Sequence, residues 1–161
     1  MKLLILDIDG TVRDRDTHII FTESKNLIKE AGSQGFKVCF CTNQGAVNHK
    51  LLRDYHITFL EMCKDLREVM EQLSVTRCVA AVGYNQDYSG LFDYVLHAYP
   101  EMKTFGDGAA WRKPGKSMID YLRTAYLHPD KVIFVGDQDS DKQAAESAGI
   151  EFWWAKYWRT K

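Results

Sequence analysis

Residues 2–14 read KLLILDIDGTVRD, an apolar run that ends in two aspartates one residue apart. The run Leu3–Leu6 has the length of a buried β-strand, and successive strand side chains point to opposite faces. We therefore expect Asp7 and Asp9 to share one face and Ile8 to lie on the other. Two carboxylates side by side at the edge of a core repel each other, so the pattern predicts a bound cation or a shared proton.

The composition is that of a globular protein with one core. Of the 161 residues, 45% are hydrophobic and 27% are charged, and the net charge of -1 indicates neither a nucleic-acid nor a membrane partner. The apolar runs are only strand-length and the N-terminus enters a strand instead of a signal peptide, so we expect a cytoplasmic protein. The four cysteines show no zinc spacing and are expected to be reduced.

Five short apolar runs alternate with helical patterns along the chain. They cover residues 3–6, 36–41, 77–82, 131–135 and 150–154. This alternation predicts an α/β fold, a doubly wound, Rossmann-like parallel sheet of about five strands with helices on both faces. We expect residues 1–161 to form a single domain, with too few residues between the first motif and the second strand for a large cap domain.

Helical patterns fill most of the gaps. They cover residues 23–31 with a stop at Gly32, residues 48–73, a stretch after Pro114, and residues 139–148 before Gly149. In the longest, apolar side chains recur every three or four residues and predict a stripe facing the core: Leu52, Tyr55, Phe59, Met62, Leu66, Val69 and Leu73. Residues 83–112 are irregular and too long for an ordinary loop, so they are either functional or contain a short unassigned element.

Polar side chains follow the strands at their carboxyl ends. Thr42 closes the second run and Asp137 the fourth. In an open doubly wound sheet ligands collect at this edge. If the first strand lies between the second and the fourth, Asp7, Asp9, Asp137 and Thr42 converge, and three carboxylates together favour a hard divalent cation such as Mg²⁺. Just before a predicted helix, Arg112 and Lys113 add cations that could meet a phosphate.

These motifs together resemble the four motifs of the haloacid dehalogenase-like (HAD) phosphatase superfamily. They occur in the family's order, as Asp7-Ile8-Asp9-Gly10-Thr11, Thr42, Lys113, and Gly136-Asp137 with Asp141. The segments CTNQG and RKPGKSMI are most similar to the branch of histidinol-phosphate phosphatase, heptose-bisphosphate phosphatase and the 3'-phosphatase of polynucleotide kinase. The sequence departs from the zinc-loop members of that branch, because no cysteine follows Cys78.

The resemblance implies a Mg²⁺-dependent phosphomonoester hydrolase that acts through an aspartyl-phosphate. Asp7 would be the nucleophile, and Asp9 would protonate the leaving alcohol and then deprotonate water. The metal would be held by the Asp7 carboxylate, the Asp9 backbone carbonyl and the Asp137 carboxylate. Asp141 would support this group from behind.

The same resemblance assigns the residues that bind the phosphate. The Thr42 hydroxyl, the Asn43 backbone N–H and the Lys113 ammonium would hold the transferring oxygens. Arg112 would reach past the phosphate to the rest of the substrate.

The substrate stays open between two classes. A small phosphorylated metabolite, such as a sugar phosphate or a compound like histidinol phosphate, fits the near-neutral charge. A nucleic-acid 3'-phosphate fits the C-terminal segment 150–161, IEFWWAKYWRTK, where aromatic and basic side chains mix. Packing in the core or in a dimer also explains that segment, and we expect a monomer or a weak dimer.

A non-catalytic phospho-receiver or binding module ranks below the enzyme. A receiver carries its acceptor aspartate at the end of the third strand, and here that strand ends in Val82-Gly83-Tyr84-Asn85.

Overall fold

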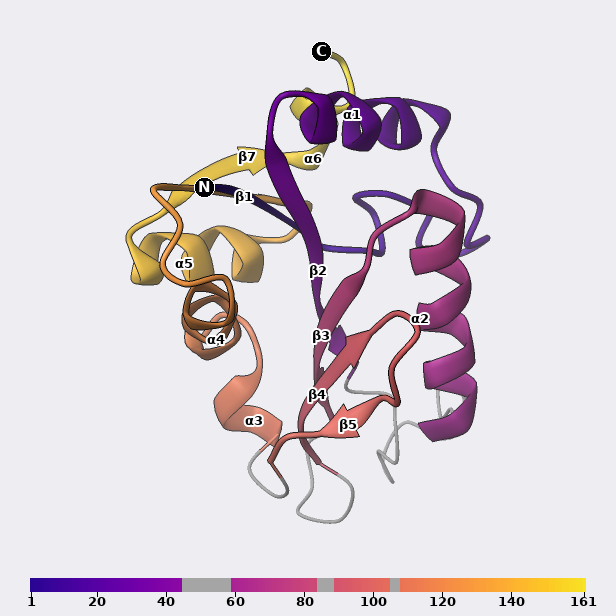
Figure 1. The fold of residues 1–161 in the computed structure, drawn as a ribbon, viewed down its shortest axis with the longest axis vertical. Helices are drawn as coiled ribbons and strands as arrows, with labels where there is room; N and C mark the ends of the chain where they lie inside the picture. Colours follow the sequence, from indigo (N-terminus) through magenta and orange to yellow (C-terminus); the bar gives the residue numbers. More distant parts are fainter. Residues whose placement is uncertain (45–58, 84–88, 105–107) are drawn as a thin grey trace.

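A computed structural model describes residues 1–44, 59–83, 89–104 and 108–161. They form one seven-stranded sheet in the order β5-β4-β3-β2-β1-β6-β7 (Figure 1). The strands span β1 Lys2–Leu6, β2 Phe36–Gln44, β3 Arg77–Val82, β4 Gly90–Val95, β5 Glu101–Met102, β6 Lys131–Gly136 and β7 Glu151–Trp154. All five predicted strands are present and pair in parallel, with β1 between β2 and β6.

The prediction of about five strands missed β4 and β5. Both lie inside the irregular segment 83–112, and both pair antiparallel, so the sheet is mixed at one edge. Strand β4 carries Phe92 and Tyr94 into the hydrophobic core, where both side chains are buried and their rings contact each other edge to face. Pairing of β4 with β3 is also fixed by Arg77, which donates two hydrogen bonds to the buried Asp93 carboxylate at 3.1 and 2.7 Å.

Helices cover both faces of the sheet. They span α1 Thr22–Ser33, α2 Phe59–Leu73, α3 Gly108–Trp111, α4 Ser117–Ala125, α5 Asp139–Ala148 and α6 Ala155–Trp158. One apolar cluster joins α1, α2 and α6 to the sheet, and a second joins α4 and α5 to the opposite face. Figure 1 shows α2 on one side of the sheet and α4 and α5 on the other. Strand alternation divides β1 between them, because Leu4 and Leu6 enter the first cluster whereas Leu3 and Ile5 enter the second.

The helix predictions are confirmed in type for the residues that the structure describes, and they differ at some boundaries. Helix α1 continues past Gly32 to Ser33, because the turn that needs a positive φ is made three residues later, by Gly35 at +85°. Helix α5 ends as predicted, with Gly149 at a φ of +68°.

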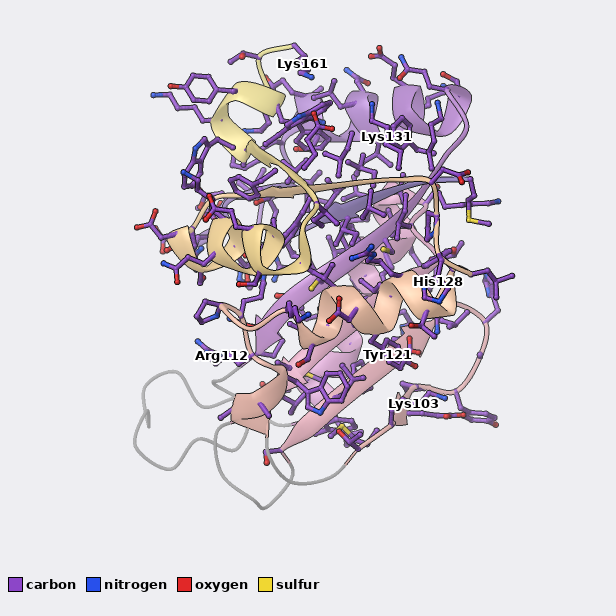
Figure 2. All side chains as sticks on the ribbon, turned by 90° about the vertical axis from the view of Figure 1, so that its left-hand side faces the viewer. Lys103, Arg112, Tyr121, His128, Lys131 and Lys161 are labelled. Carbon is purple, nitrogen blue, oxygen red and sulfur yellow. The ribbon has the colours of Figure 1, made fainter. Side chains whose placement is uncertain are left out.

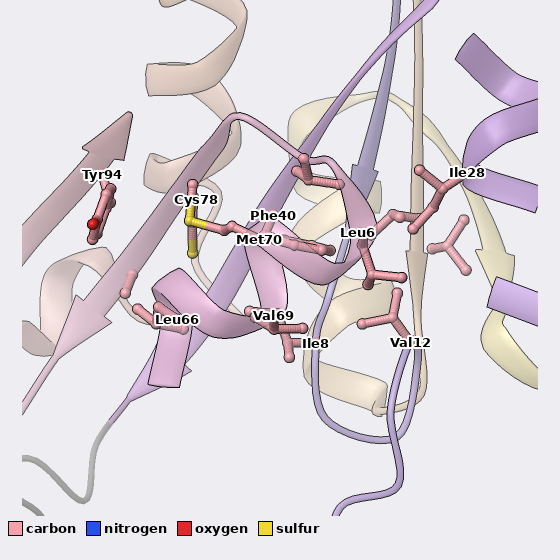
Figure 3. Packing of buried hydrophobic residues seen from close by; sticks show 14 of the residues in the cluster. Leu6, Ile8, Val12, Ile28, Phe40, Leu66, Val69, Met70, Cys78 and Tyr94 are labelled. Atoms are coloured by element: carbon pink, nitrogen blue, oxygen red, sulfur yellow. The ribbon is translucent and has the colours of Figure 1, made fainter. Parts of the chain in front are cut away.

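The stripe predicted along the longest helix faces the core where the structure describes it, and of its described members Phe59 is only partly buried against the first cluster. Met62 and Leu73 pack in the first cluster. Leu66 and Val69 belong to the same cluster (Figure 3). The expected helical start near residue 48, with Leu52 and Tyr55, lies outside the described residues.

The connection between β1 and β2 is fully described and short. From Asp7 to Gly35 the chain forms only a loop and α1, so no cap domain is inserted there. Among the described residues, none of the helices combines the length and the apolar character that crossing a membrane requires.

Candidate functional site

The central position of β1 places three sequence motifs at one edge of the sheet. Its neighbours β2 and β6 run parallel to it, so their carboxyl ends meet beside Asp7. The Asp7 backbone N–H donates to Val135 O of β6 at 3.0 Å, which continues the strand pairing one residue beyond β1. The arrangement predicted from the motifs is therefore present, with Thr42 on one side and Asp137 on the other.

Three carboxylates gather at this edge. Asp7, Asp137 and Asp141 each place an oxygen within 4.8 Å of the others. The carboxylate of Asp9 is not part of this group, although the sequence pattern predicted that it would share a face with Asp7. Strand β1 ends at Leu6, so the alternation does not extend to Asp9, whose Oδ1 accepts a hydrogen bond from Arg13 Nε at 2.7 Å.

A buried lysine joins two of the three carboxylates. Lys113 Nζ donates to Asp7 Oδ1 at 3.0 Å, to Asp141 Oδ1 at 2.5 Å and to the Cys41 carbonyl at 3.0 Å. Burial alone would lower the pKa of Lys113, but Asp7 and Asp141 outweigh burial and raise it well above its usual value. Lys113 is therefore a permanent cation on the floor of the site.

Burial and neighbouring charges together shift the pKa of Asp7. Burial raises the pKa of Asp7 to about 7, the Lys113 ammonium opposes the increase, and the charges of Asp141 and Asp137 add to it. In the metal-free protein the net effect of these groups disfavours the carboxylate form. A divalent cation at this position would reverse the balance, because it stabilises the ionised form.

Asp141 organises the loop between β6 and α5. Its Oδ2 accepts from the backbone N–H groups of Asp137 at 3.2 Å and Gln138 at 3.0 Å, which caps α5. A side chain on Gly136 would collide with it, since an added Cβ would lie 2.5 Å from Asp141 Oδ2. Asp141 is thus both the cap of α5 and a partner of Lys113.

The first motif also depends on its glycine. Gly10 has a φ of +79°, and an added Cβ would lie 2.0 Å from Asp137 Oδ2. Only glycine lets this loop approach the Asp137 carboxylate so closely.

The donor set fits a divalent metal ion. Asp137 Oδ1 is buried and accepts no hydrogen bond from the described residues, which is costly for a carboxylate oxygen unless a cation or a solvent molecule meets it. Arg15 contacts two of the atoms expected to bind the metal, with Nη2 3.0 Å from Asp137 Oδ2 and 3.3 Å from the Asp9 carbonyl. An oxygen-rich group that attracts a guanidinium in this way suits a hard cation.

A cavity of about 210 Å³ lies over the acidic group. It is lined by Asp7, Asp9, Arg15, Thr42, Asn43, Arg112, Lys113, Gln138, Ser140 and Asp141. Every site residue predicted from the sequence lines it except Asp137, which belongs to the carboxylate group just described. Arg112 follows α3 directly, on the side of the molecule shown in Figure 2.

Asn43 makes contacts that the sequence did not predict. Its side-chain Nδ2 donates to the Lys113 carbonyl at 3.2 Å, and its Oδ1 accepts from the Lys113 backbone N–H at 3.0 Å. These two bonds fix the backbone that carries the buried lysine. Thr42 is buried, and its hydroxyl accepts from Gln44 Nε2 at 3.1 Å.

Two arginines near Asp9 were also missed. Arg13 and Arg15 follow the first motif directly in the sequence VRDRD. The sequence did contain a signal for them. Both arginines follow Asp9 within six residues, and Arg13 is adjacent to the apolar Val12, so either could supply a positive charge to the acidic pair.

Sequence profiles of two related families match the chain at the two halves of this site. Residues 4–57 match the haloacid dehalogenase-like hydrolase family and residues 110–156 match the HAD-hydrolase-like family. The first match contains Asp7 and Thr42, and the second contains Lys113 and Asp137.

A sequence relative and a solved structure agree with these matches. A phosphoglycolate phosphatase of Rhodobacter capsulatus is 26% identical over 87 residues, which are 52% of this chain and 39% of that protein. The chain therefore matches well under half the length of this curated relative. The D,D-heptose 1,7-bisphosphate phosphatase of B. bronchiseptica, solved with magnesium and phosphate, is 25% identical with a TM-score of 0.60, covering 96% of this chain and 80% of that one.

A second structure shows the fold alone. A candidate HAD-like phosphatase from Mesorhizobium loti is 22% identical with a TM-score of 0.66, over 93% of this chain and 69% of that one. With the four motifs in order, the matched profiles and the shared fold, the chain belongs to the haloacid dehalogenase-like superfamily.

Proposed function

We propose that this protein is a Mg²⁺-dependent phosphomonoester hydrolase that forms an aspartyl-phosphate on Asp7. The observation that carries the proposal is the placement of Asp7 at a cavity, hydrogen-bonded to the Lys113 ammonium and within 4.8 Å of two further carboxylates. This arrangement presents a nucleophile together with both a cation and a potential metal site, as phosphoryl transfer requires.

The Asp7 and Asp137 carboxylates and the Asp9 carbonyl are the groups that would hold the metal. When bound, Mg²⁺ would neutralise phosphoryl charge and orient the phosphate for in-line attack. The buried Asp137 Oδ1, which accepts no hydrogen bond from the described residues, supports this ligand set.

Three other residues that line the cavity would bind the transferring oxygens. Lys113 supplies a fixed positive charge, and the Thr42 hydroxyl and the Asn43 backbone N–H are donors from the end of β2. Such pre-positioned groups stabilise the charge that spreads over the phosphoryl group in the transition state. Arg112, on the same cavity, would bind the part of the substrate beyond the phosphate.

Asp9 would act as general acid and then as general base. In the first step Asp7 attacks phosphorus and Asp9 gives its proton to the departing alcohol oxygen. In the second step Asp9 takes a proton from water as the water oxygen attacks phosphorus and the bond to Asp7 breaks. Each step conserves protons, so one carboxyl group serves both.

A small phosphorylated metabolite is the substrate class that we favour. The cavity is small, and phosphatases for phosphoglycolate and heptose bisphosphate are among the similar proteins. The C-terminal aromatics that suggested a nucleic-acid 3'-phosphate are largely engaged elsewhere: Trp158 is buried, and Trp153 packs against the core beneath Lys161.

The proposal also covers the domain organisation, the oligomeric state and the cellular location. We propose that residues 1–161 work as one domain without a large cap, as a monomer or weak dimer in the cytoplasm.

Phosphate release from an aryl phosphate tests the proposed function. We expect hydrolysis with Mg²⁺, none with EDTA, and loss of hydrolysis in Asp7→Asn with the circular dichroism spectrum unchanged. Full activity of Asp7→Asn would refute the proposal. A panel of phosphorylated metabolites and a 3'-phosphorylated oligonucleotide then separates the two substrate classes, since only the latter should bind with a steep dependence on salt.

A further inference from the structure

A charged network outside the metal group links the proposed general acid to helix α2. Arg13 Nε donates to Asp9 Oδ1 at 2.7 Å, while its Nη1 and Nη2 donate to the two oxygens of Asp65 at 2.8 and 2.9 Å. Asp65 lies in α2, and Arg13 lies in the loop after β1. The guanidinium thus bridges two carboxylates that are far apart in the sequence.

The guanidinium is held firmly and stays charged. Arg13 is only 3% exposed. Burial by itself would lower its pKa, but the hydrogen bonds and charges of Asp65 and Asp9 outweigh burial and raise the pKa further. The bidentate pair with Asp65 fixes the plane of the guanidinium, which in turn fixes where Nε points.

Apolar packing already attaches the loop to α2 without this charge. Ile8 and Val12 flank Asp9, and both belong to the cluster that contains Val69 and Leu66 of α2 (Figure 3). Apolar contacts hold two elements together at less cost than a buried cation, which must first be desolvated. A role beyond attachment would explain why a buried arginine reaches Asp9.

We propose that Arg13 is a positioning residue that orients Asp9 for proton transfer. Arg13 binds Oδ1 of the carboxyl group, and Asp9 lines the cavity, so Oδ2 is the oxygen that we assign to carry the transferable proton. Asp65 acts one step further out, by fixing the guanidinium. This inference rests on the proposed function, because it requires Asp9 to be the general acid.

The dependence of rate on the leaving group tests this role. A nitrophenolate leaves without help from an acid, whereas an alkoxide needs its proton. For Arg13→Met we expect kcat/KM to fall by about 100-fold with an alkyl phosphate and by less than about 10-fold with nitrophenyl phosphate. Asp65→Asn should shift the ratio of the two rates in the same direction by a smaller factor, and it serves as the second variant if Arg13→Met does not fold.

Arg77→Met is the matched control. Arg77 also forms a two-bond pair with a buried aspartate, Asp93, but it lies at the start of β3, and both of these hydrogen bonds go to Asp93, which is not a residue of the site. Both arginine variants should lower the melting temperature, and only the Arg13 variant should change the ratio of alkyl to aryl rates. An unchanged ratio in Arg13→Met and in Asp65→Asn would overturn the inference and leave Arg13 a structural residue.

Asp9→Asn separates failure of this inference from failure of the proposed function. If Asp9→Asn shows the leaving-group signature and Arg13→Met does not, the positioning role alone is wrong. If Asp9→Asn lacks the signature, Asp9 is not the general acid, and the inference falls together with that part of the proposed function.

Discussion

The guanidinium of Arg15 lies 3.0 Å from Asp137 Oδ2 and 3.3 Å from the Asp9 carbonyl, so one side chain contacts two atoms assigned to the metal. Arg15 is half exposed and can withdraw into solvent, whereas Asp137 is held by the loop between β6 and α5. A metal ion and Arg15 should therefore compete for the same oxygens.

Arg15→Gln should bind Mg²⁺ more tightly than the wild type. Removing an ion pair of this exposure is expected to improve the dissociation constant by about two- to fivefold. Isothermal titration calorimetry measures the change directly. Lys103→Gln, which removes an equal charge from the exposed pair with Glu101, is the control; an equal gain in that variant would show only a general charge effect.

The raised pKa of Asp7 predicts how the stability of the metal-free protein depends on pH. A carboxyl group with a folded-state pKa of about 7, against 3.8 for an unperturbed aspartate, favours folding below pH 3.8 and loses that contribution as the pH rises through 7. Relative to Asp7→Asn, the wild type should lose about 4 kcal/mol of unfolding free energy between pH 3 and pH 8. Urea denaturation in EDTA measures it, and parallel curves for the two proteins would contradict the raised value.

Lys113→Met should affect both stability and rate. The variant leaves Asp7 and Asp141 without their shared cation, which is expected to cost about 3 to 5 kcal/mol of unfolding free energy. Because Mg²⁺ meets part of the lost charge, it should restore more stability to the variant than to the wild type. The rate should still fall by about 10²- to 10³-fold, because a donor to the phosphoryl oxygens is gone; an active variant would exclude Lys113 from the phosphate site.

Thr42 offers a cleaner test of phosphate binding. Thr42→Val removes the hydroxyl at nearly constant volume and should lower kcat by about 10²- to 10³-fold. Thr42→Ser keeps the donor and should retain most activity. If the serine and valine variants behaved alike, the hydroxyl would have no part in the reaction.

The parts of the fold that the sequence predicted are those governed by local patterns. The run Leu3–Leu6 and the turn at Gly149 are examples, since each depends on residues close in the chain. The short strands β4 and β5 could not be predicted in this way, because their pairing is antiparallel to β3 and depends on contacts such as Arg77 with Asp93.

For the site, the sequence predicted which residues come together but not the direction of every side chain. The convergence of Asp7, Thr42 and Asp137 follows from parallel strands ending at one edge, and the sequence shows where each strand ends. The direction of the Asp9 carboxylate could not be foreseen, because it is decided by Arg13 and by Asp65 of a distant helix. The side-chain bonds between Asn43 and Lys113 likewise join segments 70 residues apart.

Trapping the phosphorylated enzyme tests the central claim most directly. Borohydride reduces an acyl phosphate to an alcohol, so it would convert a phosphorylated aspartate to homoserine. During turnover with Mg²⁺, peptide mass spectrometry should find homoserine at position 7 in the wild type and none when substrate is omitted. Phosphate release under the same conditions without homoserine at position 7 would contradict the account.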